Sequence, residues 1–259
     1  MANIIENQIL INTPRGIKAD FHRESSDVLV VRNCRVIGVA DKNEDGIQML
    51  GPGLAHIEQC YLSNEGFSPD GMDELASVVD GADVIFEHCY FGFNGKGALI
   101  GSGDTIASDY KSRRATFNNC VFDGCCRRSV YAQFGQTRMH RCWVRNWGIP
   151  ETFHEKANGA RSGKHGQLMV SNSIFEQRPF WSCIDKNFFR DLFHQYNHWW
   201  YPGFMKAVYA EFGGQTKAYH CYKNRWWLRL ANHTDPMKSD EAEELKQYLT
   251  ENVIDCWKK

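Results

Sequence analysis

A six-residue motif with a cysteine in its fourth position recurs along the chain, and this repeat constrains the fold more than any other feature. Its clear copies read VRNCRV, IEQCYL, FEHCYF, FNNCVF and MHRCWV, and their cysteines are Cys34, Cys60, Cys89, Cys120 and Cys142. A sixth copy, VSNSIF, has Ser173 in the cysteine position, and a weaker seventh, AYHCYK, contains Cys221. The first six copies follow one another at intervals of 22 to 31 residues. One short strand therefore recurs, with loops of variable length between its copies.

The spacing and the composition of this motif predict a parallel β-helix. Residues two apart lie on one face of a strand, so the cysteine and its neighbours alternate between the inside and the outside. A small, weakly polar side chain in one position suits stacking between turns that lie about 4.8 Å apart. The intervals match one turn of a coil with three short strands. We expect an all-β, single-stranded parallel β-helix with an internal stack of cysteines; a β-sandwich with accidental cysteines is the alternative.

The ten cysteines of the chain do not indicate a disulfide scaffold. Such scaffolds occur mostly in small secreted domains that cannot build a core, and this chain has 259 residues. The sequence contains no CxxC pair and no Cys/His cluster at zinc spacing, and Cys125 and Cys126 are too close for an ordinary disulfide. Buried free thiols survive most easily when a protein folds in a reducing compartment, so extracellular work would follow late release, as from a virus particle after lysis.

Length and charge set the expected organisation and partners. We expect one domain over residues 1–259, with β-helix turns and loops over 1–235 and a helix over 236–259. The formal net charge of -1 gives no global attraction to nucleic acid, and no apolar run approaches the roughly 18 residues of a membrane span. The N-terminal segment does not resemble a signal peptide. We expect neither nucleic acid nor membrane as a partner, and the sequence leaves the oligomeric state open.

The C-terminal segment SDEAEELKQYLTENVIDCW has the pattern of an amphipathic helix. A serine precedes acidic residues, as at a helix start, and Leu245, Leu249 and Val253 recur at fourfold spacing. A β-helix has open hydrophobic ends and free strand edges, which terminal caps close. We therefore expect this helix to act as a C-terminal helical cap.

Four sequence blocks between Asp45 and Trp147 are similar to those of a known family. DGIQMLGPGLAHIEQCYLS resembles a strand that starts with an acidic ligand and leads into a WIDH strand, and DGMDE resembles a second acidic cluster. KGALIGSGD resembles a KxxLIGxSD turn, and RRSVYAQFG with RMHRCWVRNWG resembles an RxPxxRxG strand and the strand after it. Order and approximate spacing agree with the pectate lyase family of right-handed parallel β-helix polysaccharide lyases, of which the chain resembles a phage-borne or divergent member.

This resemblance implies an enzyme that cleaves an acidic, uronate-containing polysaccharide such as pectate by calcium-assisted β-elimination. Neutralising the uronate carboxylate acidifies the proton beside it, and calcium, with six to eight oxygen ligands, does this well. By resemblance, the Ca²⁺ ligands are Asp45, Asp70 and Glu74, and Asp73 competes with Glu74 because the loop length is not fixed. Taken singly, acidic residues in loops with Gly and Pro are ordinary turn residues.

The same resemblance assigns the cationic residues. Lys96 would bind a substrate carboxylate, and Arg128 would be the catalytic base; otherwise Lys96 is a turn residue and the pair Arg127 and Arg128 a surface feature. Arg127 faces the other way on a strand. An arginine base is awkward because its pKa exceeds about 12, and nearby cations would lower that pKa. Gln133 stands at the family's second, substrate-binding arginine, so a bidentate carboxylate clamp is missing there.

Departures from the family pattern keep other functions open. The WIDH strand reads HIEQ here, and Val130 replaces a proline. A carbohydrate-binding or phage virion structural β-helix without elimination chemistry is the main alternative to the lyase. A glycoside hydrolase on the same fold would need two carboxylates about 5 to 9.5 Å apart. For a lyase we expect extracellular action, either as a mature secreted form or as a phage depolymerase released by lysis.

Overall fold

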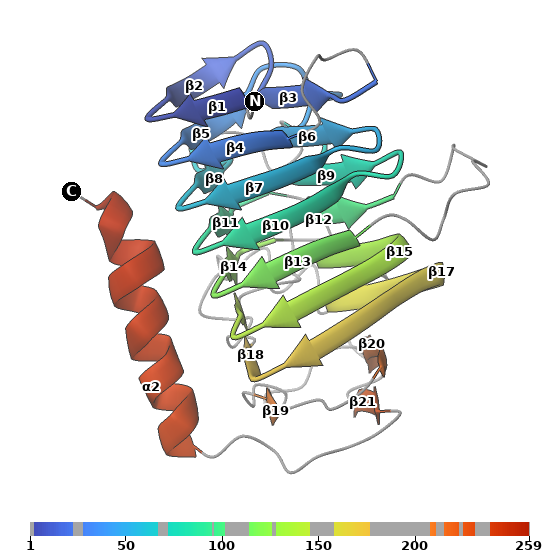
Figure 1. Cartoon of the computed structure of the whole chain (residues 1–259). Helices are drawn as coiled ribbons and strands as arrows, with labels where there is room; N and C mark the ends of the chain where they lie inside the picture. The colour runs from blue at the N-terminus through green and yellow to red at the C-terminus, as the bar shows by residue number, and fades with distance from the viewer. Residues whose placement is uncertain are drawn as a thin grey trace, which may run out of the picture.

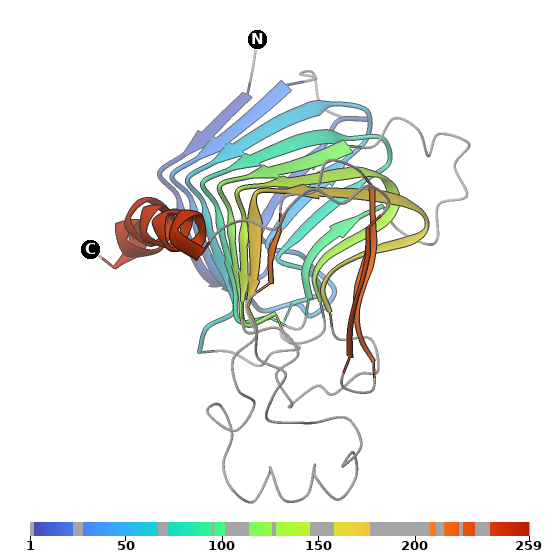
Figure 2. The same ribbon diagram turned by 90° about the horizontal axis from the view of Figure 1, so that it is seen from below.

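The chain winds into a parallel coil in which each complete turn contributes three strands (Figures 1 and 2). The computed structural model describes residues 3–22, 28–66, 72–94, 96–101, 114–125, 128–145, 158–176, 208–210, 215–222, 225–230 and 239–258. The right-handed parallel β-helix predicted from the sequence is thereby confirmed, and the β-sandwich is excluded.

Equivalent strands of successive turns pair in register and form three faces. Face 1 consists of β1 (Asn3–Glu6), β4 (Val28–Arg32), β7 (Leu54–Glu58), β10 (Asp83–Glu87) and β13 (Arg114–Asn118). Face 2 consists of β2 (Ile9–Thr13), β5 (Arg35–Val39), β8 (Tyr61–Ser63), β11 (Tyr90–Gly92), β14 (Val121–Asp123), β16 (Trp143–Arg145) and β18 (Ser173–Glu176). Face 3 consists of β3 (Ile17–Asp20), β6 (Ile47–Leu50), β9 (Ala76–Val79) and β12 (Lys96–Ile100).

Two long strands continue around the corner between face 3 and face 1. β15 (Arg128–His140) pairs with β12 through its first residues and with β13 through its last ones. β17 (Asn158–Ser171) pairs with β15 along both parts, with a register shift between Ala132 and Phe134 of β15. Faces 1 and 3 therefore merge at this end of the coil into one continuous sheet.

Aromatic stacking fills the interior of the coil. Phe86 and Phe117 are register partners on face 1, and their rings stack with centroids 4.7 Å apart. Phe91 and Phe122 stack in the same way on face 2, at 4.6 Å. All four side chains are fully buried. The turn-to-turn spacing of the coil thus coincides with the stacking distance of like rings, which repeats one good contact along the axis.

The cysteine column lies at the tight corner between faces 1 and 2, where the sequence repeat predicts it. Its members are Cys34, Cys60, Cys89, Cys120 and Cys142, followed by Ser173; all are buried, and none of these cysteines forms a disulfide. The residue before each member has a positive φ, between 45° and 53°, which turns the chain within two residues. Each thiol donates weakly to a carbonyl of the preceding turn, as in the 3.4 Å contact from Cys89 Sγ to Ile57 O. The predicted internal stack is confirmed.

The seventh motif copy, around Cys221, does not form another turn, and this part of the interpretation was wrong. It lies in β20 (Gln215–Tyr222), which pairs antiparallel with β17 and with β21 (Arg225–Leu230). β19 (Val208–Ala210) likewise pairs antiparallel with β18. Antiparallel strands therefore cover the edge of the last turn, which would otherwise present unpaired backbone groups.

The C-terminal helix exists, but it covers a flank of the coil and not an end. α2 (Ser239–Leu249) continues through the turns η3 (Thr250–Ile254) and η4 (Asp255–Trp257), and it runs along the stack in Figure 1. The predicted stripe of Leu245, Leu249 and Val253 is buried. It packs against the outward column of face 2, formed by Tyr61, Tyr90, Val121, Trp143 and Ile174. Because this column is apolar, the flank requires cover, and the helix supplies it.

Candidate functional site

Charged residues occupy one position per turn at the start of the face 3 strands. Lys96 opens β12 and is the register partner of Arg128, which opens β15. Asp45 and Glu74 each stand two residues before the paired residues of β6 and β9, so they continue the same series. We call Asp45, Glu74, Lys96 and Arg128 the charged row. Its order runs from two acids to two bases along the coil axis.

Asp45 is held by hydrogen bonds from its neighbours. Its carboxylate accepts the Ser77 hydroxyl at 2.5 Å, the Gln48 side-chain amide at 2.9 Å and the Glu74 backbone N–H at 2.9 Å. The side chain is buried, which raises its pKa, and the donors oppose that rise. Asp45 therefore fixes the loop before β9 against the loop before β6.

Glu74 is the most perturbed acid of the row. Only 3% of it is exposed, and its carboxylate lies 3.2 Å from the Lys96 ammonium. Burial and the neighbouring acid Asp73 raise the pKa of Glu74 to about 8, although the charge of Lys96 opposes the shift. Lys96 also forms an ion pair with Asp73, whose side chain is 45% exposed. Asp73 and Lys96 are thus the members of this cluster that reach toward solvent.

Three carboxylates meet at this point in the described part of the chain. One oxygen each from Asp45, Asp73 and Glu74 lies within 4.8 Å of the other two. Oxygen ligands of this kind suit a hard cation such as calcium. Lys96 supplies one positive charge beside these three carboxylates. The residues therefore fit a bound cation, which would share Asp73 and Glu74 with Lys96.

The structure brings together only some of the site residues that the sequence predicts. Asp45, Glu74 and Lys96 come together, and Asp73 joins them. Asp70 and Arg127 lie outside the described residues, and for Arg128 only the backbone position in β15 is described. Gln133 lies half-buried beside the register shift of β15, past the last residue that pairs with β12. Lys96 and Gln133 therefore belong to opposite ends of that pairing.

Sequence reasoning missed a buried amide that shapes the site. Asn94 is fully buried, and its side-chain N–H groups donate to the Lys96 carbonyl at 2.8 Å and the Asp73 carbonyl at 3.3 Å. It thereby joins the loop that carries Asp73 to the strand that carries Lys96. The only sequence signal is an asparagine two residues before Lys96 in FNGK, a common loop pattern.

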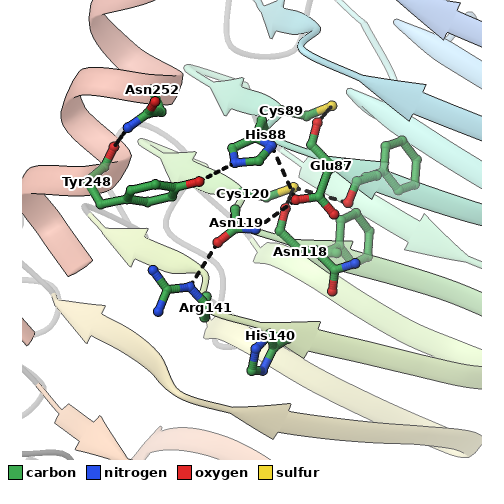
Figure 3. Close-up of polar contacts among 12 residues, drawn as sticks. Glu87, His88, Cys89, Asn118, Asn119, Cys120, His140, Arg141, Tyr248 and Asn252 are labelled. Carbon is green, nitrogen blue, oxygen red and sulfur yellow. Dashed lines mark hydrogen bonds and ion pairs between the residues drawn. The ribbon is translucent and has the colours of Figure 1, made fainter. Parts of the chain in front are cut away.

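A second polar cluster lies outside the cysteine corner and joins α2 to the coil (Figure 3). His88 contacts the Tyr248 hydroxyl at 2.7 Å through Nε2 and the Glu87 carboxylate at 3.2 Å through Nδ1. Asn119 donates to Glu87 at 2.7 Å, and Arg141 donates to Asn119 at 3.0 Å. His88, Asn119 and Arg141, each the residue before a cysteine of the column, are thus linked through Glu87 into one polar network that contacts the helix. We interpret this cluster as the polar attachment of α2.

The comparisons with known proteins address the fold. None of the helices in the described segments is long and apolar enough to cross a membrane. A search of the curated proteins finds no match to this chain. The family profile described as "Right handed beta helix region" matches residues 3–184, which include all of the charged row and the cysteine column. The chain therefore belongs to the right-handed β-helix family.

Proposed function

We propose that this protein is a polysaccharide lyase that cleaves an acidic, uronate-containing polymer such as pectate by calcium-assisted β-elimination. The observation that carries the proposal is the charged row, in which clustered carboxylates adjoin Lys96 and the backbone of Arg128 on successive turns. The right-handed β-helix fold is compatible with proteins that act on polysaccharides. Its substrate would lie outside the cell, in a wall or capsule.

Each residue of the row has a proposed role. Asp73, Glu74 and Asp45 would hold calcium, which supplies the positive charge that acidifies the proton beside a uronate carboxylate. Lys96, whose side chain is 21% exposed, would bind a uronate carboxylate as a point charge. Arg128 would remove the proton. Lys96 and a bound calcium, if close to this guanidinium, would lower its pKa and favour action at alkaline pH.

The position of Gln133 bears on the substrate. A neutral amide cannot clamp a second carboxylate as an arginine does. Pectate would therefore need a different subsite for its second carboxylate, whereas a polymer with more widely spaced carboxylates would need no such clamp. Bacterial capsular polymers with one uronate per repeat meet this condition.

The decisive experiment follows the ultraviolet absorbance of the unsaturated uronate product. Purified protein is incubated with polygalacturonate, alginate and uronate-containing capsular polymers, with and without calcium, at neutral and alkaline pH. We expect an absorbance rise with at least one polymer that a calcium chelator abolishes. Failure with all of them in the presence of calcium would overturn the lyase proposal.

Two arginine variants test the assignment within the row. Arg128→Lys should reduce turnover by at least about 100-fold, because it replaces the proposed proton acceptor. Arg127→Ala, one residue earlier in the sequence, is the matched control and should keep most activity. Equal losses in both variants would show that the base has been assigned to the wrong position.

Carbohydrate binding without catalysis is the second candidate, and one observation favours it. Asp45 and Glu74 are only 6% and 3% exposed, so these acids face the protein more than the solvent. In this case the row is a structural charge cluster. Binding of the same polymers without any rise in absorbance would support this function over the lyase.

A further inference from the structure

A cleft lies away from the charged row, between face 2 and the C-terminal end of the helical segment. Its volume is about 620 Å³, within the range of small-molecule sites. Residues from five successive turns of the coil line it, together with Trp257 of η4. The cleft lies along the face 2 strands, whereas the charged row lies at the start of the face 3 strands.

Aromatic side chains build one side of this cleft. Tyr61 and Tyr90 stack on each other with ring centroids 4.7 Å apart, and Trp257 packs against Tyr61 at 5.9 Å in a tilted arrangement. Phe93 stands at the rim, and 40% of it is exposed. Phe93 thus offers an exposed apolar ring of the kind that packs against the C–H groups of a sugar.

Hydrogen-bond donors without acceptors point to a negatively charged ligand. Arg35 extends over the Tyr61 ring at 5.2 Å and forms no ion pair with any described residue. Arg145 pairs with Asp123 at 2.7 Å. The Nε atoms of Arg35 and Arg145 are both buried without an acceptor within the described residues. Arg35 therefore keeps hydrogen-bonding capacity that no described acceptor uses.

The charges of the lining agree with this interpretation. Asp123 is neutralised by Arg145 and also accepts a hydrogen bond from the Tyr90 hydroxyl. Glu65 accepts a hydrogen bond from the Tyr61 hydroxyl. Arg35 therefore remains the uncompensated cation of the cleft among the described residues, and guanidinium groups bind carboxylate or sulfate through two parallel hydrogen bonds.

We propose that this cleft binds an acidic saccharide unit, with the sugar ring against Phe93 and Trp257 and its carboxylate or sulfate on Arg35. The site is separate from the charged row and binds sugar whether or not the row catalyses elimination. On a polymer-cleaving protein, such a site holds a second part of the chain and raises the effective concentration of substrate at the first.

Isothermal titration calorimetry of the full-length protein tests the proposal. The probes are trigalacturonate, a sulfated heparin-derived disaccharide and neutral maltotriose, measured in the presence of a calcium chelator so that calcium-dependent turnover does not consume the ligand. Acidic probes should bind and maltotriose should not. Arg35→Gln should weaken acidic binding by at least about tenfold, because a charge-assisted hydrogen bond is lost. The preference between the first two probes distinguishes a uronate from a sulfated sugar.

Arg32→Gln is the matched control, because it is the same substitution three residues earlier in the sequence, on face 1. There Arg32 pairs with Glu6 at 2.6 Å. It should leave binding unchanged. Phe93→Asn provides a second variant that tolerates the positive φ of 54° at this position and should also weaken binding. Equal binding by the Arg35→Gln and Arg32→Gln proteins, or no binding of either acidic probe, would overturn the proposal. A missing absorbance signal in the lyase assay would leave this result unaffected.

Discussion

The cysteine column and the charged row are both built from one position per turn, yet they follow opposite rules. The column keeps one kind of residue over successive turns and is fully buried. The row changes sign, from Asp45 and Glu74 to Lys96 and Arg128, and it has the partly exposed Asp73 beside it. The column lies at a two-residue corner, and the row follows loops of variable length.

The stacking distance explains this contrast. Neutral thiols about 4.8 Å apart can contact each other and the backbone carbonyls between them, so identity along the axis is stabilising. Burial raises the pKa of the Cys120 thiol, which keeps it neutral. Like charges at the same distance repel, so a charged series must alternate or bind a counter-ion. Uniformity therefore marks the structural corner, and variation marks the corner available for function.

The largest effect should come from placing a charge in the column. Cys89→Asp would bury an ionised or unpaired carboxyl in the core, and we expect a loss of more than about 3 kcal/mol in the free energy of unfolding. Cys89→Ser is the matched control and should cost about 1 kcal/mol, because Ser173 already occupies one position of the column. Urea unfolding followed by circular dichroism measures both. Equal destabilisation would contradict a column that requires neutrality.

Removing the cation of the row should have the next largest effect. Lys96→Met leaves Glu74 buried beside Asp73 and Asp45 without its partner, and we expect a loss of about 2 to 3 kcal/mol. Adding Glu74→Gln should restore most of it. Lys18→Met on the exposed side of β3 is the control and should be nearly neutral. If the double variant is no more stable than Lys96→Met, the two residues are not coupled.

The row should also make stability depend on pH. Glu74 has its pKa raised from 4.5 to about 8, so the folded state holds a proton that the unfolded state releases between these values. The contribution of Glu74 is fully present below about pH 4.5 and is lost as pH rises through about 8. In metal-free protein with chelator, the stability of the wild type relative to Glu74→Gln should therefore fall across this window. A stability difference between the two proteins that stays constant over this pH range would contradict the raised pKa of Glu74.

The smallest effect concerns the outer side of the cysteine corner. Tyr248→Phe removes the hydroxyl that contacts His88 but keeps the ring, and we expect a loss of about 1 kcal/mol. Hydrogen exchange should become faster in α2 and stay unchanged in the strands around the cysteine column. Asn252→Ala, which removes a hydrogen bond within the helical segment, is the control for helix fraying. Faster exchange in the column as well would show that the helix supports the corner itself.

The repeat predicted the coil and the cysteine column because both depend on local periodicity, which a single sequence displays. The stripe of Leu245, Leu249 and Val253 likewise predicted a helix. Its location on the flank could not be predicted, since the aromatic column that it covers is assembled from residues of different turns. The motif at Cys221 misled for the same reason: six residues specify a strand, and pairing partners decide whether it is parallel or antiparallel.

The sequence by itself therefore determined the parallel β-helix, its internal cysteines and the approximate positions of the charged residues. Only the tertiary structure brought Asp73 to Lys96, joined both loops through Asn94, and placed Arg35 beside Trp257. Periodic positions stack because each turn repeats the last, so their neighbours follow from spacing. Contacts made by variable loops and by the returning C-terminal segment have no period, and their geometry exists only after the coil has formed.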